Sequence, residues 1–196
     1  MTSLGFSLKP LPSAYIMPHL KITGYISRRS GTLAVSYELS GPLAKIVIPA
    51  PSDMPSRKND LWKETCFEFF IAAKNSEQYR EFNLSPSGHW NVYRFESYRK
   101  GVREEPAFSS LPFSVKREKD SLQLSLELDI GKIMPPDQIL KAAVSAVIKY
   151  ADGKIVFWAL THPGQKADFH RRDGFIIELK SIQGKFPERG CLQESA

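Results

Sequence analysis

The side chains best suited to bind a ligand lie in residues 61–101, which show the alternation of three β-strands. Successive side chains of a strand point to opposite faces of the sheet. In the first strand Phe67 and Phe69 therefore share one face, and Glu68 points to the other. Because a carboxylate accepts hydrogen bonds from hydroxyl and amide groups, Glu68 is a candidate ligand-binding residue.

The next two strands extend this polar face. In the third strand the alternation groups Tyr93 with Phe95, and we expect this aromatic pair to face the core. If the three strands are neighbours, the opposite face displays Glu68, Asn83, Trp90 and Arg94. A carboxylate, an amide, an indole and a guanidinium side by side suit a polar ligand with an apolar face. For Arg94 the alternative is a surface salt bridge.

A second group of polar residues occupies the segment 161–174, which reads as a loop with a turn at each end. His162 and His170 lie here with Asp168 and Asp173. Imidazole and carboxylate groups bind zinc and iron, but this spacing matches no metal motif, so we predict no metal site. Loops on a rigid scaffold often contact ligands. His162 and His170 are therefore candidate ligand contacts, with a structural role as the alternative.

Two tryptophans are further candidates. Trp62 lies at a loop-to-strand junction shortly before Glu68, where an exposed ring can stack on a ligand. Trp158 lies within the apolar run IVFWAL, which favours a core position, with ligand contact as the alternative. We assign no catalytic residue: no serine stands in a G-x-S-x-G setting, and Glu68 with Glu81 would serve glycoside hydrolysis only at the required separation.

Strand patterns recur along the whole chain. Besides the central block they cover residues 20–27, 32–40, 43–49, 113–117, 122–129, 142–150, 155–160 and 174–179. About ten short strands without a long helix predict an all-β, antiparallel β-sandwich. We expect residues 1–19 to be an N-terminal extension, residues 20–180 to form the single domain, and residues 181–196 to be a tail.

Composition narrows the function classes. The 196 residues carry a formal charge of +6, but basic residues are interleaved with acidic ones, so no nucleic-acid partner is expected. No apolar run approaches the roughly 20 residues of a membrane-spanning helix. The N-terminus is broken by Pro10, Pro12 and Pro18 and makes a poor secretory signal, which predicts a cytoplasmic location. Cys66 and Cys191 form neither a disulfide framework nor a metal knuckle, and no cofactor is predicted.

Three motifs carry a family resemblance: LWKETCFEFFI, YREFNLSPSGHWNVYRF and FWALTHPGQKADFHRRDGFIIEL. They resemble the bacterial DOMON-like proteins related to family 9 carbohydrate-binding modules. The resemblance implies a jelly-roll-like β-sandwich with a site for sugars or, in other DOMON branches, haem. In the sugar-binding modules a tryptophan precedes a strand carrying a glutamate, which Trp62 and Glu68 match, and an arginine follows, which Arg94 matches. A second tryptophan near the C-terminal end corresponds to Trp158, with Phe169 or His170 as substitutes.

The expected function is non-catalytic binding of a carbohydrate or sugar-like small molecule on one face of the sandwich. Haem is disfavoured because His89, His162 and His170 lie near turns, whereas axial ligation needs a well-placed side chain. Two alternatives stay open: an enzyme acting on a small glycan or sugar phosphate, and a protein–protein interaction module whose interface includes Trp90. The oligomeric state is not predicted.

Overall fold

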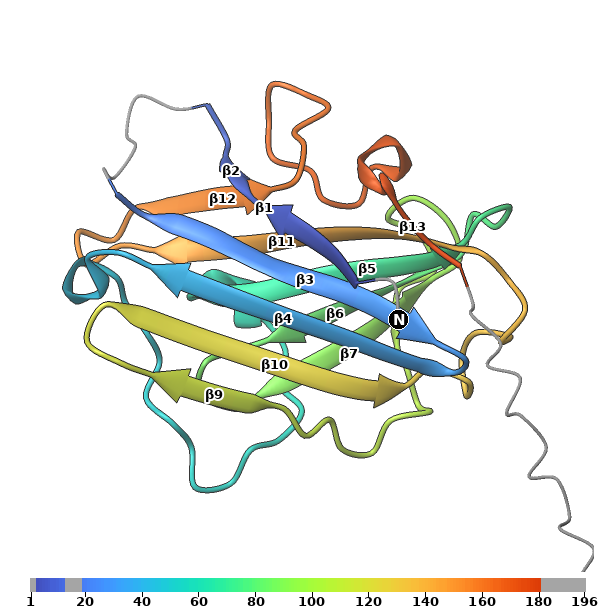
Figure 1. Ribbon diagram of the computed structural model, residues 1–196, viewed down its shortest axis with the longest axis horizontal. Coiled ribbons are helices and arrows are strands. Elements are labelled where there is room, and N and C mark those ends of the chain that lie inside the picture. The colour runs from blue at the N-terminus through green and yellow to red at the C-terminus, as the bar shows by residue number, and fades with distance from the viewer. Residues whose placement is uncertain (1–2, 13–18, 181–196) are drawn as a thin grey trace, which may run out of the picture.

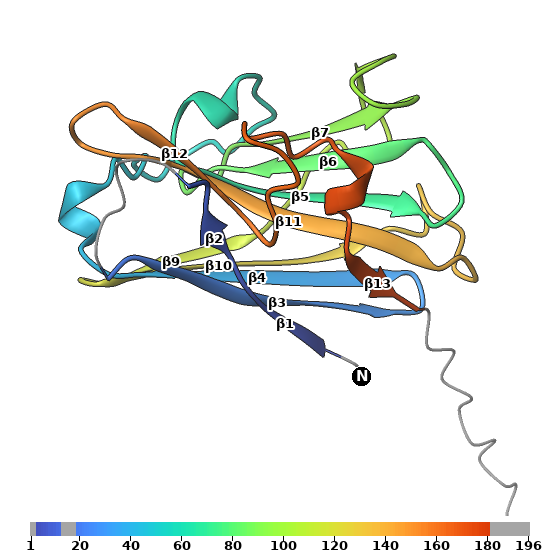
Figure 2. The same ribbon diagram turned by 90° about the horizontal axis from the view of Figure 1, so that it is seen from above.

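The computed structural model of the protein describes residues 3–12 and 19–180. Two antiparallel sheets pack face to face in an all-β, jelly-roll-like sandwich, as the sequence predicts (Figures 1 and 2). The main core lies between the sheets and is filled by apolar side chains from both. Within the described residues the helical segments are three short 3-10 turns.

The first sheet, sheet A, has five strands. Its order is β1 (Ser3–Ser7), β3 (Lys21–Arg29), β4 (Thr32–Ser40), β10 (Ser121–Asp129) and β9 (Ser114–Arg117). Strand β4 alternates buried and partly exposed residues along its length, and β10 does the same. This period of two shows that sheet A covers the core with one face and meets solvent with the other.

The second sheet, sheet B, carries the central block of the sequence. Its order is β2 (Lys9–Pro10), β12 (Ile155–Ala159), β11 (Leu140–Lys149), β5 (Cys66–Ala73), β6 (Tyr79–Leu84), β7 (Trp90–Phe95) and β8 (Arg103–Glu104), and β13 (Ile177–Leu179) pairs with β11. Strand β5 is buried on both faces over almost its whole length. Sheet B is therefore covered on its outer face as well.

The outer face of sheet B holds a second apolar cluster. Its buried members are Phe70, Ala72, Tyr79, Phe95, Ala143 and Phe175. Phe70 and Tyr79 come from the sheet, whereas Phe175 comes from the chain that follows β12. Figure 2 shows this chain lying over the sheet. The loop that the sequence places at 161–174 is thus packed against sheet B by aromatic contacts.

One expected strand is absent, and another is shorter than expected. Residues 43–49 form a 3-10 turn, Leu43–Lys45, and a single bridge between Ile46 and Tyr150 in place of a strand, because Gly41 and Pro42 impose a turn directly before them. The expected strand at 174–179 contains only β13, which is preceded by the 3-10 turn Arg172–Gly174.

The expected N-terminal extension is also incorrect. Strand β1 pairs with β3 in sheet A, and β2 pairs with β12 in sheet B, so residues 3–10 cross from one sheet to the other (Figure 2). The backbone N–H of Leu8 still bonds Ile22 of sheet A, at 2.9 Å, whereas that of Leu11 bonds Phe157 of sheet B, at 2.7 Å. The predicted tail at 181–196, including Cys191, lies outside the described residues.

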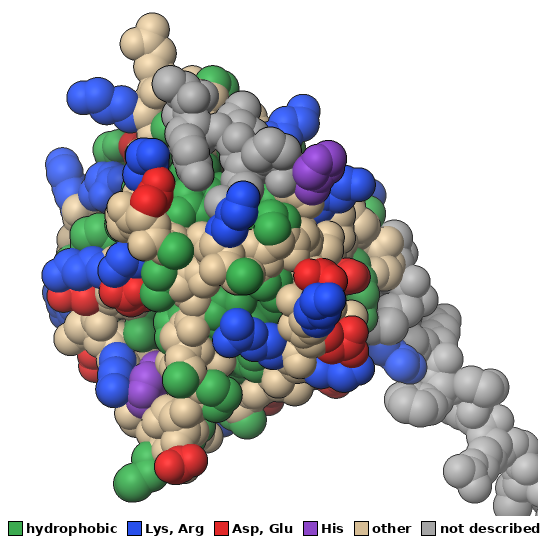
Figure 3. All heavy atoms as spheres, turned by 90° about the vertical axis from the view of Figure 1, so that its left-hand side faces the viewer, with side chains coloured by type: hydrophobic (Ala, Val, Ile, Leu, Met, Phe, Trp, Pro, Cys, Tyr) green, Lys and Arg blue, Asp and Glu red, His purple; other side chains and the backbone are tan. Residues whose placement is uncertain are grey.

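The surface carries mixed charge. On the face drawn in Figure 3, basic side chains stand beside acidic ones, as the interleaved sequence predicts. Within ranges 3–12 and 19–180, no helix has the length and apolarity needed to cross a bilayer.

Candidate functional site

A pocket of about 490 Å³ opens on the outer face of sheet B. Strand residues at its base are Glu68, Glu81, Tyr93, Phe95, Val147 and Phe157. Its walls are built by loop residues Trp62, Arg99, Val102, Ala167, Phe169 and His170. The three loops rise above the sheet in Figure 2. A rigid sheet thus supplies the floor, and three separate connections supply the walls.

Strand register decides which residues face the pocket. Glu68 lies opposite Asn83, and Asn83 lies opposite Asn91 on β7, so these three side chains share the outer face. The same alternation turns Trp90 and Arg94 toward the core side. Placing them beside Glu68 is therefore wrong. Both faces of β7 carry large side chains, so alternation alone did not show which face is the outer one.

Two buried carboxyl groups form the polar part of the floor. Glu68 is 3% exposed and Glu81 is 8% exposed. Register makes them diagonal neighbours, since Glu81 lies two residues from the partner of Glu68. Burial raises the pKa of both, and repulsion by Glu81 raises that of Glu68 further. A hydrogen bond from Ser145 offsets part of the rise for Glu68. The Asn83 amide donates to Glu81 Oε1 at 2.8 Å and offsets part of the rise in the pKa of Glu81.

His170 lies beside this acid pair, with its Nε2 3.9 Å from Glu81 Oε2. Its Nδ1 lies 2.9 Å from the hydroxyl of Tyr79, which accepts the backbone N–H of Arg99 at 3.2 Å. The Tyr79 hydroxyl therefore donates to Nδ1, which assigns the ring proton to Nε2. Burial, followed by the charge of Arg99, lowers the pKa of His170 to about 4. The ring is neutral at pH 7.

Asp168 joins two of the pocket walls. Its carboxylate accepts hydrogen bonds from Tyr98 Oη and from Arg99 Nη2, the latter at 2.8 Å, and from the backbone N–H of His170 at 3.3 Å. The loop that presents Arg99 is a tight one, with Arg99 at φ 54° and Gly101 at φ 64°. Asp168 thereby fixes the Arg99 guanidinium at the pocket.

Asp168→Asn should loosen this junction. We expect the free energy of unfolding to fall by about 1–2 kcal/mol, because two charge-assisted hydrogen bonds are weakened. Backbone hydrogen exchange at residues 161–171 should accelerate. The control is Asp173→Asn, which removes the charge from an exposed pair with Arg171 and should change stability far less. Equal effects of the two variants would contradict the role assigned to Asp168.

Trp62 stands at the pocket rim and is 47% exposed. It belongs to the 3-10 turn Leu61–Lys63, which follows Asp60 at φ 62°. Lys63 Nζ bonds the Asp60 carboxylate at 2.7 Å and lies 5.6 Å from the Trp62 ring centroid. The indole therefore offers a partly open aromatic face above the buried acids.

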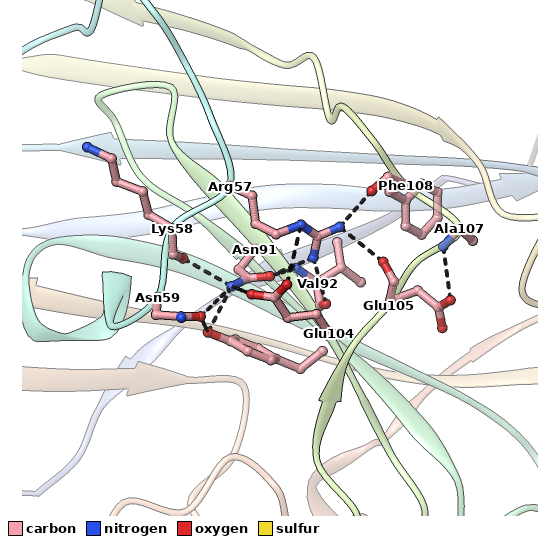
Figure 4. A network of polar contacts seen from close by, with 10 residues as sticks. Arg57, Lys58, Asn59, Asn91, Val92, Glu104, Glu105, Ala107 and Phe108 are labelled. Atoms are coloured by element: carbon pink, nitrogen blue, oxygen red, sulfur yellow. Dashed lines mark hydrogen bonds and ion pairs between the residues drawn. The ribbon is translucent and has the colours of Figure 1, made fainter.

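Arg57 anchors the loop that leads to Trp62 (Figure 4). Its guanidinium donates to Asn91 Oδ1 at 2.8 Å and to the carbonyls of Val92, Glu105 and Phe108 at 3.3, 3.0 and 2.6 Å. The same group lies 4.4 Å from the Trp90 ring centroid. Trp90 and Asn91 thus serve as the attachment point of this loop.

The remaining sequence-predicted residues lie elsewhere. Trp158 is 3% exposed and belongs to the main core, so the core interpretation is the one that the structure supports. Asn83 is buried below the pocket lining, where it orients Glu81. His162 is outside the pocket, and its Nε2 donates to the Lys9 carbonyl at 2.9 Å. Within the described chain, His, Cys, Asp and Glu side chains form no group of three suited to a metal ion.

Several pocket residues were not among the sequence candidates: Tyr93, Phe95, Arg99 and Phe157. Phe169 was named only as a substitute for the second tryptophan, and Glu81 only as a partner of Glu68 in hydrolysis. Glu81 carried a usable signal, because it shares a strand face with Asn83. Tyr93 and Phe95 were assigned to the core because they are aromatic. Arg99 lies in a loop whose course depends on positive backbone angles, and its local sequence gave no sign of the pocket.

The sequence matches no known protein-family profile and no curated protein. Solved structures with a similar fold include a Bacteroides uniformis protein proposed to bind carbohydrate, which is 11% identical, with a TM-score of 0.67 over 90% of this chain and 87% of that one. A family 9 carbohydrate-binding module from Caldicellulosiruptor kristjanssonii, in complex with glucose, is 10% identical. Its TM-score is 0.53 over 88% of this chain and 83% of that one. The cellotriose complex of a family 9 module from the same organism is 10% identical, with a TM-score of 0.50 over 87% of this chain and 80% of that one. The chain therefore has a β-sandwich fold like that of carbohydrate-binding modules.

Proposed function

We propose that the outer pocket of sheet B binds a carbohydrate or sugar-like small molecule without altering it chemically. The observation that carries this proposal is the combination of two buried carboxyl groups, Glu68 and Glu81, with aromatic rings around them. Sugars present hydroxyl groups to hydrogen-bond acceptors and C–H faces to aromatic rings. Both kinds of partner are present in one pocket.

The size of the pocket and the fold of the chain agree with this proposal. A volume of about 490 Å³ lies within the range of small-molecule sites, about 300–1,000 Å³. The two Caldicellulosiruptor kristjanssonii module structures contain glucose and cellotriose. We further propose membership of the DOMON-like proteins, on the motifs around Trp62 and Glu68.

A thermal-shift screen against mono- and oligosaccharides tests the proposed function, since a ligand that binds only the folded state raises Tm. For any sugar found, Trp62→Ala should weaken binding about tenfold through loss of ring stacking. The matched control is Tyr25→Ala, which removes an aromatic side chain, 52% exposed, from sheet A. If the sugar still raises the Tm of both variants, it binds outside this pocket. The same conclusion follows if the rise is lost equally in both.

One observation favours an enzyme as the second candidate. Two carboxyl groups with raised pKa values in a pocket are a recurring arrangement for proton transfer. If the pocket hydrolyses glycosides, the chain should release the chromophore of aryl glycosides, and Glu68→Gln and Glu81→Gln should each abolish the release. Binding of a sugar with no turnover over long incubation would reject this candidate and leave the binding proposal in place.

A further inference from the structure

The acidic side chains of the pocket lining outnumber its basic ones. Two carboxyl groups, Glu68 and Glu81, form the floor, and Arg99 is the basic residue among the lining side chains. The Arg99 guanidinium is already paired with Asp168, at 2.8 Å. Among the described residues, no lysine or arginine forms an ion pair with Glu68 or Glu81. The acid pair therefore lacks an ion-paired lysine or arginine, although the charge of Arg99 acts on Glu81 from a distance and lowers its pKa in part.

Histidine does not fill that role. His170 approaches Glu81 at 3.9 Å, but its ring is packed edge-on against Phe70 and Phe95, with centroids 5.5 and 5.0 Å away. This apolar surrounding disfavours the charged form of imidazole. At neutral pH His170 is therefore neutral, and it supplies no positive charge to offset ionisation of the acid pair.

The rings around the acids suit a cation. Five aromatic side chains line the pocket: Trp62, Tyr93, Phe95, Phe157 and Phe169. The face of an aromatic ring attracts an ammonium group, and this attraction grows when the group is desolvated. Glu68, at 3% exposure, is a buried carboxyl group that faces the pocket without an ionic partner. An acidic floor under aromatic walls is a setting for a positively charged group.

We infer that the ligand of this pocket is an amino sugar, with its ammonium group seated against Glu68 and Glu81 and its ring carbons against the aromatic walls. The sugar part of this inference rests on the proposed function. The ammonium supplies the charge that the chain lacks, so it forms charge-assisted hydrogen bonds with the acid pair. Because an acid pair without a cation retains protons more readily, binding of an ammonium group should release protons to the buffer.

Isothermal titration with glucosamine, N-acetylglucosamine and glucose tests the inference. We expect glucosamine to bind at least about tenfold more tightly than the other two, since N-acetylation removes the charge and glucose lacks the nitrogen. Repeating the titration in buffers of different ionisation enthalpy should show proton release for glucosamine, and none for glucose.

Variants assign the preference to the acid pair. Glu68→Gln and Glu81→Gln should each reduce the preference for glucosamine over glucose. Glu127→Gln, an exposed glutamate on β10 of sheet A, is the matched control and should retain it. Because the proton release is measured on the unmodified chain, the inference stays testable if a variant fails to fold.

The possible outcomes separate the two proposals. Equal binding of glucosamine and glucose would overturn the amino-sugar inference and leave sugar binding standing. A preference unchanged in both pocket variants would also overturn it, because the ammonium would then sit elsewhere. Failure of all three sugars to bind would count against the proposed function itself, and the inference would fall with it.

Discussion

Arg57→Met should lower the free energy of unfolding by about 3 kcal/mol, which corresponds to roughly 6–12 °C in Tm for a domain of this size. The guanidinium donates to Asn91 Oδ1 and to three backbone carbonyls, two of them, Glu105 and Phe108, on the connection that follows β8. Methionine keeps much of the aliphatic contact with Trp90 but leaves these acceptors without their donor. Chemical denaturation of the variant measures the loss.

The consequence should reach the pocket. Residues 51–60 lead directly into the turn that carries Trp62, so a loosened loop should also weaken any ligand that stacks on this ring. Arg103→Met is the control, because the Arg103 side chain is 64% exposed and pairs with an exposed Glu96. It should change stability by less than about 0.5 kcal/mol. Similar losses in the two variants would show that Arg57 does not anchor the loop.

Glu68→Gln should increase stability at neutral pH by about 2 kcal/mol, the scale of an incompletely compensated buried polar group. Burial raises the pKa of Glu68 well above its usual 4.5, so the folded state binds a proton that the unfolded state has already released. Stability linked to this group is fully present below about pH 4.5 and is lost as the pH rises through the folded value. The gain in the variant should therefore grow with pH from about 4.5 upward.

His170 acts in the opposite direction. Its pKa falls from 6.5 to about 4 on folding, so its contribution is present above pH 6.5 and is lost as the pH falls toward 4. Comparing Glu68→Gln with the wild type at each pH cancels much of this term, because both proteins contain His170. Glu127→Gln, at an exposed position of sheet A, is the control for the substitution itself. A Glu68→Gln variant that is less stable than the wild type at pH 7 would mean that the carboxylate is well compensated in the folded chain.

Local patterns were enough to predict much of the fold. Residues 32–40 alternate cleanly and form β4 with the predicted bounds, and the turn at 151–154 joins β11 to β12 as a hairpin. The interpretation of 43–49 as a strand was wrong because an apolar run does not distinguish a strand from a chain that turns after Gly41-Pro42. The pairing of β1 and β2 with different sheets is non-local, and the local sequence of residues 3–10 does not predict it.

The site was predictable only in part. Alternation correctly separated Glu68 from Phe67 and Phe69, and the structure brings Glu68, Trp62 and His170 to one pocket. Their roles in ligand binding remain predictions. Alternation gives relative facing within one strand, whereas the facing of Trp90 and Arg94 depends on the register between β6 and β7. When both faces of a strand are aromatic, that register has to be known.

Residues 3–10 run from sheet A to sheet B, and this path has a consequence for solubility. Edge strands expose unpaired backbone groups that can recruit other chains. Strand β1 covers the edge of β3, and β2 covers the edge of β12. Detachment of residues 3–10 would therefore expose two edge strands at once. It would also take away the carbonyl of Lys9 that holds His162. Resistance to aggregation and the position of the loop above the pocket therefore both depend on residues 3–10.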